Sequence, residues 1–60
     1  MTKAEAIARA WKMVEEEQFN EAFAFGYENG IELTDDWEEE NGTEYYIVTV
    51  EDLVYRTIAE

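Results

Sequence analysis

The chain has 60 residues, of which 16 are Asp or Glu and four are Lys or Arg, and its formal net charge at pH 7 is −12. A chain of this length makes one domain with a small core, near the lower limit for folding without a metal, a disulfide or a partner subunit. Cysteine and histidine are absent, which excludes a disulfide framework and the thiolate and imidazole ligands of transition metals.

The first predicted element is a helix over residues 2 to about 18. Thr2 is followed three residues later by Glu5, which is the spacing of a capping box. Apolar residues then recur at helical intervals, at Ile7, Trp11 and Val14. The chain starts without an apolar signal segment, and its apolar runs are too short to cross a bilayer. We therefore expect a cytoplasmic protein.

Two Asn-Gly pairs predict hairpin turns in the middle of the chain. Asn29-Gly30 and Asn41-Gly42 each lie between runs that alternate or are rich in β-forming residues, which is the strongest short-range signal for a β-hairpin. The sequence thus predicts a three-stranded antiparallel meander with strands over about 21–27, 31–40 and 43–50.

The register of these strands can be tested against the apolar pattern, because a slip of one residue sends every side chain to the other face. With a two-residue turn between the last two strands, Trp37 lies opposite Tyr46. Leu33 then lies opposite Val50. The apolar residues share one face, which we expect to be the core face: Phe23, Phe25, Tyr27, Ile31, Leu33, Trp37, Tyr46, Val48 and Val50. Asp35 falls on this face as well, so a bulge or an edge position has to relieve it.

Residues 20–29 also fit a second helix in place of the first strand. Apolar and small residues form a helical stripe there, at Phe19, Ala22, Phe23, Gly26 and Tyr27. Asn20 is then a candidate N-cap, and Gly30 is a candidate helix end. Both interpretations of this segment stay open at the level of sequence.

The segment from Glu51 onward predicts a short C-terminal helix. Glu51 and Asp52 are acids that suit a helix N-terminus, and apolar residues follow at helical spacing, at Leu53, Val54 and Ile58. The predicted fold of residues 1–60 is therefore a single α+β domain, in the order helix, three-stranded meander, short helix. Both helices should pack on the aromatic face of the sheet.

No combination of residues in the chain indicates an enzyme, and we predict no catalytic residue, no cofactor and no metal site. A domain this small has little room for the concave, water-shielded pocket that catalysis needs. The acids from Asp36 onward resemble a calcium loop only superficially. Gly42 is the seventh residue of that loop and not the sixth, and Ile47 stands where the closing glutamate belongs.

The acids are concentrated in one long segment. From Glu15 to Glu44 there are twelve acids and no base. Such a segment repels nucleic acid and anionic membranes and attracts proteins with basic grooves. Two clusters oppose the fold, because one places acids at the negative end of the first helix and the other sets Glu39 opposite Glu44. The candidate partner-binding residues are therefore Glu15, Glu16, Glu17, Asp36, Glu38, Glu39, Glu40, Glu44, Tyr45 and Ile47.

The spacing of the strand acids suggests a function. Asp36, Glu38 and Glu40 should project from one face about 6.7 Å apart, twice the rise of a strand. Phosphates along one DNA strand are about 3.4 Å apart on the helix axis and further apart along the winding backbone. This similarity favours a nucleic-acid mimic that occludes the DNA- or RNA-binding surface of a basic protein and does not itself bind nucleic acid.

Small acidic phage and mobile-element products that block restriction, CRISPR or DNA-repair machinery have the same general physical character, although no motif here matches a named family. The alternative hypothesis is a generic protein–protein interaction module or a homodimer. Its interface would be formed by Tyr45, Ile47 and Trp37, and the acids would serve solubility.

Overall fold

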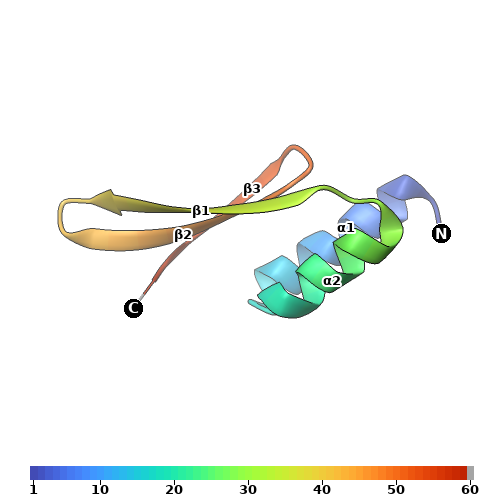
Figure 1. Ribbon diagram of the computed structural model, residues 1–60, viewed down its shortest axis with the longest axis horizontal. Coiled ribbons are helices and arrows are strands. Elements are labelled where there is room, and N and C mark those ends of the chain that lie inside the picture. The colour runs from blue at the N-terminus through green and yellow to red at the C-terminus, as the bar shows by residue number, and fades with distance from the viewer. Residues whose placement is uncertain (60) are drawn as a thin grey trace.

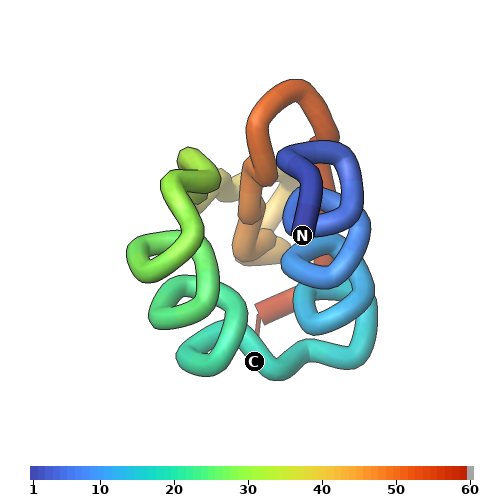
Figure 2. Tube along the Cα trace, turned by 90° about the vertical axis from the view of Figure 1, so that its right-hand side faces the viewer, coloured from blue at the N-terminus to red at the C-terminus, as the bar shows by residue number. Residues whose placement is uncertain are grey.

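In the folded chain both helices precede all of the strands. The computed structural model describes residues 1–59, with the elements α1 (Lys3–Glu15), α2 (Phe19–Asn29), β1 (Leu33–Glu40), β2 (Thr43–Val50) and β3 (Leu53–Ile58). The strands form one antiparallel sheet in the order β1-β2-β3, and the helices pack on one of its faces (Figure 1). Viewed from the helical end, α1 and α2 lie side by side (Figure 2). The protein is α+β, but its element order differs from the predicted one.

The helix α1 begins at the predicted capping box. The Glu5 N–H donates a hydrogen bond to the Thr2 hydroxyl at 3.1 Å, and the Thr2 N–H donates to the Glu5 carboxylate at 2.8 Å. The hydrogen bond from the Thr2 backbone, supported by the one from its side chain, lowers the pKa of Glu5. Two residues three apart thus fix where the helix starts.

Residues 19–29 form a helix, so the predicted first strand over 21–27 is wrong and the alternative helix is correct. Gly30 ends α2 in the left-handed conformation, with φ 68°, and its N–H donates to the Gly26 carbonyl. The Asn29 side chain donates to the Phe25 carbonyl inside the helix, so the pair Asn29-Gly30 is a helix end and not a hairpin turn. The helix is preceded by Gln18 as N-cap residue, not by the predicted Asn20.

The absence of a side chain at Gly26 lets α2 approach the chain that enters β1. Gly26 is buried, and a Cβ atom placed there would collide with the Leu33 side chain and lie 3.0 Å from the Ile31 carbonyl oxygen. This contact seats the end of α2 against the start of the sheet.

The C-terminal segment forms the strand β3 in place of the predicted helix. A two-residue turn at Glu51 and Asp52 joins β2 to β3, so that Val50 pairs with Leu53. Glu51 takes the left-handed conformation, with φ 54°. Its N–H donates to the Glu32 carbonyl, and its carboxylate accepts from the Glu32 N–H, both at 2.9 Å. The β-branched and aromatic residues that follow favour a strand: Val54, Tyr55, Thr57 and Ile58.

The hairpin of β1 and β2 has the predicted register, with Trp37 paired to Tyr46. The turn residues Asn41 and Gly42 both have positive φ, 54° and 82°, as a two-residue hairpin turn of type I′ requires. Asp35 pairs with Val48 on the helix-side face, as the sequence indicates, yet it is exposed. Of the two predicted forms of relief, the edge position is correct, because β1 is an edge strand of the sheet; the Tyr46 hydroxyl also donates to the Asp35 carboxylate at 2.8 Å.

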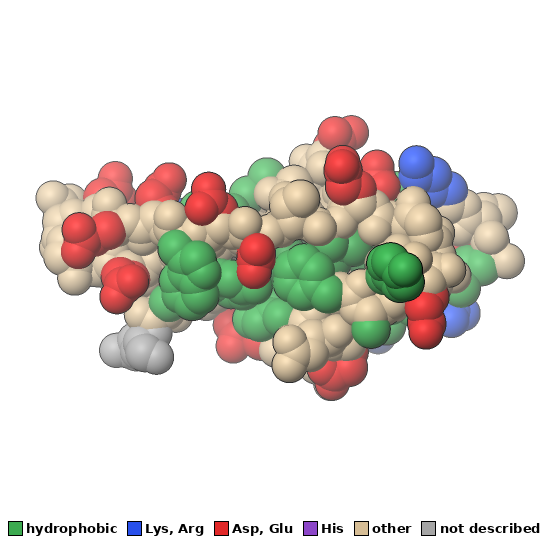
Figure 3. Space-filling view, viewed as in Figure 1, with side chains coloured by type: hydrophobic (Ala, Val, Ile, Leu, Met, Phe, Trp, Pro, Cys, Tyr) green, Lys and Arg blue, Asp and Glu red, His purple; other side chains and the backbone are tan. Residues whose placement is uncertain are grey.

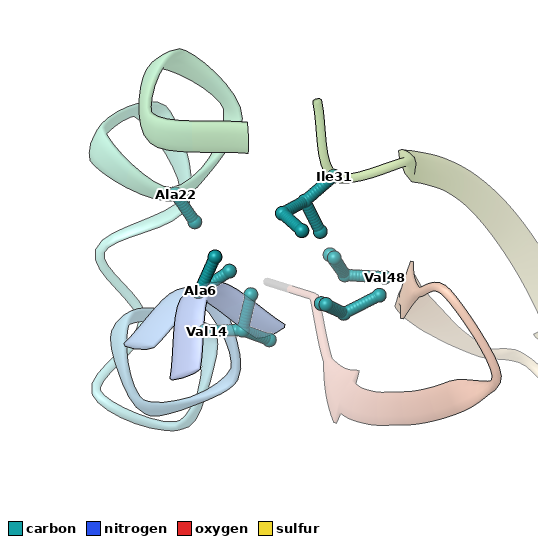
Figure 4. Packing of buried hydrophobic residues seen from close by; sticks show 7 residues of the cluster. Ala6, Val14, Ala22, Ile31 and Val48 are labelled. Carbon is teal, nitrogen blue, oxygen red and sulfur yellow. The ribbon is translucent and has the colours of Figure 1, made fainter. Parts of the chain in front are cut away.

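The core lies between the helices and one end of the sheet, where buried side chains from α1, α2 and the strands point toward one another (Figure 4). They are Ala6, Ala10, Val14, Ala22, Ile31, Val48 and Val50. Two residues predicted for this core are instead exposed, Tyr27 by 91% and Trp37 by 60%. The helices leave the far end of the sheet uncovered, and the molecule therefore extends over 41 × 18 × 15 Å (Figure 1).

Candidate partner-binding surface

The hairpin of β1 and β2 carries most of the predicted site on an arm that projects beyond the helices (Figure 1). Every β1 residue after Leu33 is exposed. Residues 35–44, here named the acidic arm, contain no Lys or Arg and six acids: Asp35, Asp36, Glu38, Glu39, Glu40 and Glu44. In Figure 3 acidic side chains are spread over this arm, whereas the basic side chains visible in that view lie at the opposite end of the molecule.

Strand alternation divides the predicted arm residues between the two faces of the sheet. The face turned away from the helices, here named the open face, carries Asp36, Glu38, Glu40, Tyr45 and Ile47. Glu39 and Glu44 lie on the helix-side face, directly opposite each other as predicted. Like charges in this position destabilise a sheet, so the pair adds negative charge to the surface but lowers the stability of the fold.

Arg56 of β3 neutralises part of the open face, a contact that the sequence analysis missed. Its Nη2 atom lies 3.2 Å from Glu38 Oε1 and 3.4 Å from Glu40 Oε1. Its guanidinium carbon stands 3.7 Å from the centre of the Tyr45 ring. Arg56 falls within the predicted C-terminal helix, which gives no sign of this contact, whereas β3 pairs with β2 and places Arg56 beside Ile47. These ion pairs are exposed, and such pairs contribute at most about 1 kcal/mol each.

The second predicted cluster, Glu15 to Glu17, lies where α1 ends. Glu15 and Glu16 are exposed there, and Glu17 takes the left-handed conformation with φ 61°. The Glu17 carboxylate accepts hydrogen bonds from the hydroxyls of Tyr55 and Thr57, both at 3.1 Å. These bonds tie the end of α1 to β3. Burial and, after it, the hydrogen bond to Glu17 raise the pKa of Tyr55.

A cleft of about 370 Å³ lies between this helix end and the acidic arm. Eight residues line it: Glu17, Phe19, Asn20, Trp37, Tyr46, Thr57, Ile58 and Ala59. The Trp37 and Tyr46 rings are 4.7 Å apart between centres, and the Phe19 ring meets Tyr46 edge-on at 5.0 Å. Burial and the hydrogen bond to Asp35 raise the pKa of Tyr46 to about 12.

This aromatic cleft brings together residues that the sequence analysis kept apart. Glu17 is the one predicted site residue among those that line it, while Trp37 and Tyr46 were assigned to the core face. The apolar side chains seen in Figure 3 gather in the band between the arm and the helices. The cleft therefore joins one acid of the helix-end cluster, Glu17, to the aromatic residues Trp37 and Tyr46 of β1 and β2.

Within residues 1–59, no group of three or more side chains is arranged to hold a metal ion. Neither of the two helices in that range is long and apolar enough to span a membrane. No protein-family model, curated protein or solved structure matches the chain.

Proposed function

We propose that this protein is a non-enzymatic, acidic binding protein that occupies the nucleic-acid-binding surface of a basic partner protein. The observation that carries this proposal is the acidic arm, whose β1 strand is exposed along nearly its whole length and which contains six acids and no base. Concentrated charge of one sign on a projecting element steers a partner of opposite charge and accelerates association.

The geometry of β1 supports a partner that normally grips phosphates. Asp36, Glu38 and Glu40 alternate along the strand on the open face, with a spacing of about 6.7 Å from the strand rise. The sheet fixes the strand positions that carry these side chains, so their carboxylates recur at a regular interval along a groove lined with Lys and Arg. The ion pairs of Arg56 are exposed and weak, and a partner's cations can displace them at small cost.

The experiment that tests this function compares the protein with a variant of its arm. Immobilised protein captures partners from a lysate of the source cells, and the partners are identified by mass spectrometry. We expect nucleic-acid-binding proteins that moderate salt releases and that duplex DNA or RNA displaces. Changing Glu38, Glu39 and Glu40 together to Gln should slow association with the captured partner and leave the fold intact, because it also relieves the repulsion between Glu39 and Glu44.

A matched control carries the same change of charge outside the arm. Glu21, Glu28 and Glu32 are exposed and lie in α2 or just before β1, so their joint replacement by Gln should change association far less. If the arm variant bound the partner with unchanged affinity and unchanged salt dependence, the arm acids would serve solubility only, and the proposal would be wrong.

A second candidate function is self-association through the open face. Val54 and Ile58 lie on that face with 62% and 59% of their surface exposed, beside the half-buried Tyr45 and Ile47. Trp37 lies on the other face and cannot join them. Light scattering over a range of concentrations decides the matter: a dimer that Val54→Lys dissociates supports this function.

A further inference from the structure

Trp37 is a large apolar side chain that the core does not explain. It is 60% exposed, yet its ring is held against Tyr46, at 4.7 Å between centres and an angle of 44°. Phe19 also contacts Tyr46, edge-on at 5.0 Å between ring centres. Three aromatic rings thus form a prepared wall of the aromatic cleft, whose volume of about 370 Å³ admits a side chain or a small ligand.

Two carboxylates belong to this surface, that of Glu17, a lining residue, and that of Asp35, which is hydrogen-bonded to the lining residue Tyr46. Glu17 is one of the residues that line the cleft, and its carboxylate is held by the hydroxyls of Tyr55 and Thr57 at 3.1 Å. The Asp35 carboxylate accepts the Tyr46 hydroxyl at 2.8 Å, at the edge of the same ring. The ion pairs within residues 1–59 join Lys3 or Arg56 to other acids, and none reaches these two carboxylates. The cleft therefore combines exposed aromatic faces with negative charge that no cation of this part of the chain balances.

On the open face, a guanidinium group occupies a site that has the same combination of an aromatic ring and carboxylates. There the Arg56 guanidinium lies 3.7 Å over the Tyr45 ring and contacts the carboxylates of Glu38 and Glu40. The chain itself thus fills one site made of an aromatic ring and two carboxylates with a guanidinium. The helix-side face presents the same chemistry, with more aromatic surface.

We infer that the aromatic cleft binds an arginine side chain of the basic partner protein, an inference that rests on the proposed function for the class of partner. The guanidinium stacks on the Trp37 ring, because tryptophan offers the strongest cation–π surface. It donates hydrogen bonds to the Glu17 carboxylate, whose two hydroxyl partners already fix its position. Arginine fits better than lysine, because a planar guanidinium stacks and donates at once, whereas an ammonium is a compact and strongly hydrated point charge.

The test uses a defined probe, a capped Gly-Arg-Gly peptide, titrated into the intact protein and followed by NMR. The indole N–H signals of Trp37 and Trp11 report on two places, because Trp11 packs edge-on against Tyr55 in α1's contact with the sheet. We expect the arginine peptide to shift the Trp37 signal and to leave that of Trp11 nearly unchanged. The matched peptide with citrulline, which has the shape of arginine without its charge, should cause little shift, and the lysine peptide should bind more weakly.

Two variants sharpen this test. Glu17→Gln removes the charge but keeps an oxygen that can accept from Tyr55, and we expect it to weaken arginine binding by about fivefold or more. Trp37→Leu should weaken binding to a similar degree. Glu28→Gln, which makes the same charge change on an exposed residue of α2, should leave the affinity unchanged. If Trp37→Leu disturbs the fold, Glu17→Gln and the peptide series still decide the question.

Equal shifts with the citrulline peptide, or shifts confined to the open face, would overturn the inference. The peptide carries one arginine and no nucleic-acid-binding domain, so this outcome is independent of the lysate capture. If the peptide titration failed, the proposal of a nucleic-acid-binding partner would still stand. If the lysate capture failed, the proposal of an arginine site would still stand.

Discussion

Two glutamates at connections between elements adopt the left-handed backbone conformation, which usually favours glycine. Glu17 ends α1 with φ 61°, and Glu51 turns β2 into β3 with φ 54°. A left-handed residue other than glycine costs about 1–2 kcal/mol, and here tertiary hydrogen bonds offset this cost. Glu17 accepts from Tyr55 and Thr57 on β3, and Glu51 exchanges two bonds with Glu32. Each of these side chains therefore stabilises a connection between elements, although its charge alone suggests only a solvent-exposed acid.

The raised pKa of Tyr46 predicts a loss of stability at alkaline pH. The unfolded chain releases this proton near pH 10, whereas burial and Asp35 raise the pKa in the fold to about 12. The folded state therefore binds more protons between these values, and the free energy of unfolding falls as pH rises from 10 to about 12. Tyr46→Phe should reduce the slope of this dependence in urea denaturation measured across that range, while Tyr55, whose pKa is also raised, keeps its own contribution. Equal slopes for the two proteins would show that another group governs alkaline unfolding.

At the scale of residues, the sequence predicts contacts between residues that are close together in the chain. The capping box of Thr2 and Glu5 is visible because its partners are three apart. The bond of Glu17 to Tyr55 joins residues 38 apart and leaves no local signal. The exposure of Trp37 is hidden for a related reason, since it shares a face with Leu33, Tyr46 and Val48 and only the placement of the helices leaves it uncovered.

At the scale of elements, α2 shows a conflict between local preference and packing. Glycine is a poor helix former, costing about 1 kcal/mol relative to alanine. Gly26 is nevertheless buried in α2 and contacts Leu33 and the Ile31 carbonyl. The contact to the backbone cannot relax by turning a side chain, so packing outweighs propensity at this position.

Gly26→Ala should therefore destabilise the protein although it favours the helix. We expect a net loss of about 1–3 kcal/mol in the free energy of unfolding, typical of overpacking. The control is Ala24→Gly, at an exposed position of the same helix, which should cost about 1 kcal/mol by propensity alone. Chemical denaturation measures both. A Gly26→Ala protein that is more stable than the original would refute the close approach of α2 to β1.

The elements differ in how far sequence could predict them. The hairpin of β1 and β2 was predictable in its register, because Asn41-Gly42 supplies the two positive φ values that the turn requires. The turn before β3 consists of Glu51 and Asp52, which carry no such signal, so the apolar spacing of the segment after it favours a helix. Residues 19–29 satisfy both periodicities, and tertiary packing, mainly of α2 on α1, decides for the helix.

At the scale of the whole molecule, charge is separated along the long axis. Three of the four basic residues lie in α1, and the acidic arm projects from the other end. The fold brings Arg56 alone to the arm. With a net charge of −12, the compact state retains strong repulsion between like charges.

This repulsion predicts that salt stabilises the protein. Raising sodium chloride from about 10 mM to about 150 mM shortens the screening length from about 30 Å to about 8 Å, and the melting temperature should rise. Thermal unfolding followed by circular dichroism at several salt concentrations measures the effect. A melting temperature that falls over this range would mean that attractive pairs such as that of Lys3 and Glu51 dominate.

The order of the elements has a consequence for the speed of folding. Along the chain, α1 packs on α2, β1 pairs with β2, and β2 pairs with β3, so these pairings join neighbours through short connections. Such contacts require little loop closure before they form, and proteins rich in them reach the native state quickly. The chain also contains no proline, whose isomerisation causes slow refolding phases. A protein with so small a core unfolds readily, and this topology lets the unfolded chain refold rapidly.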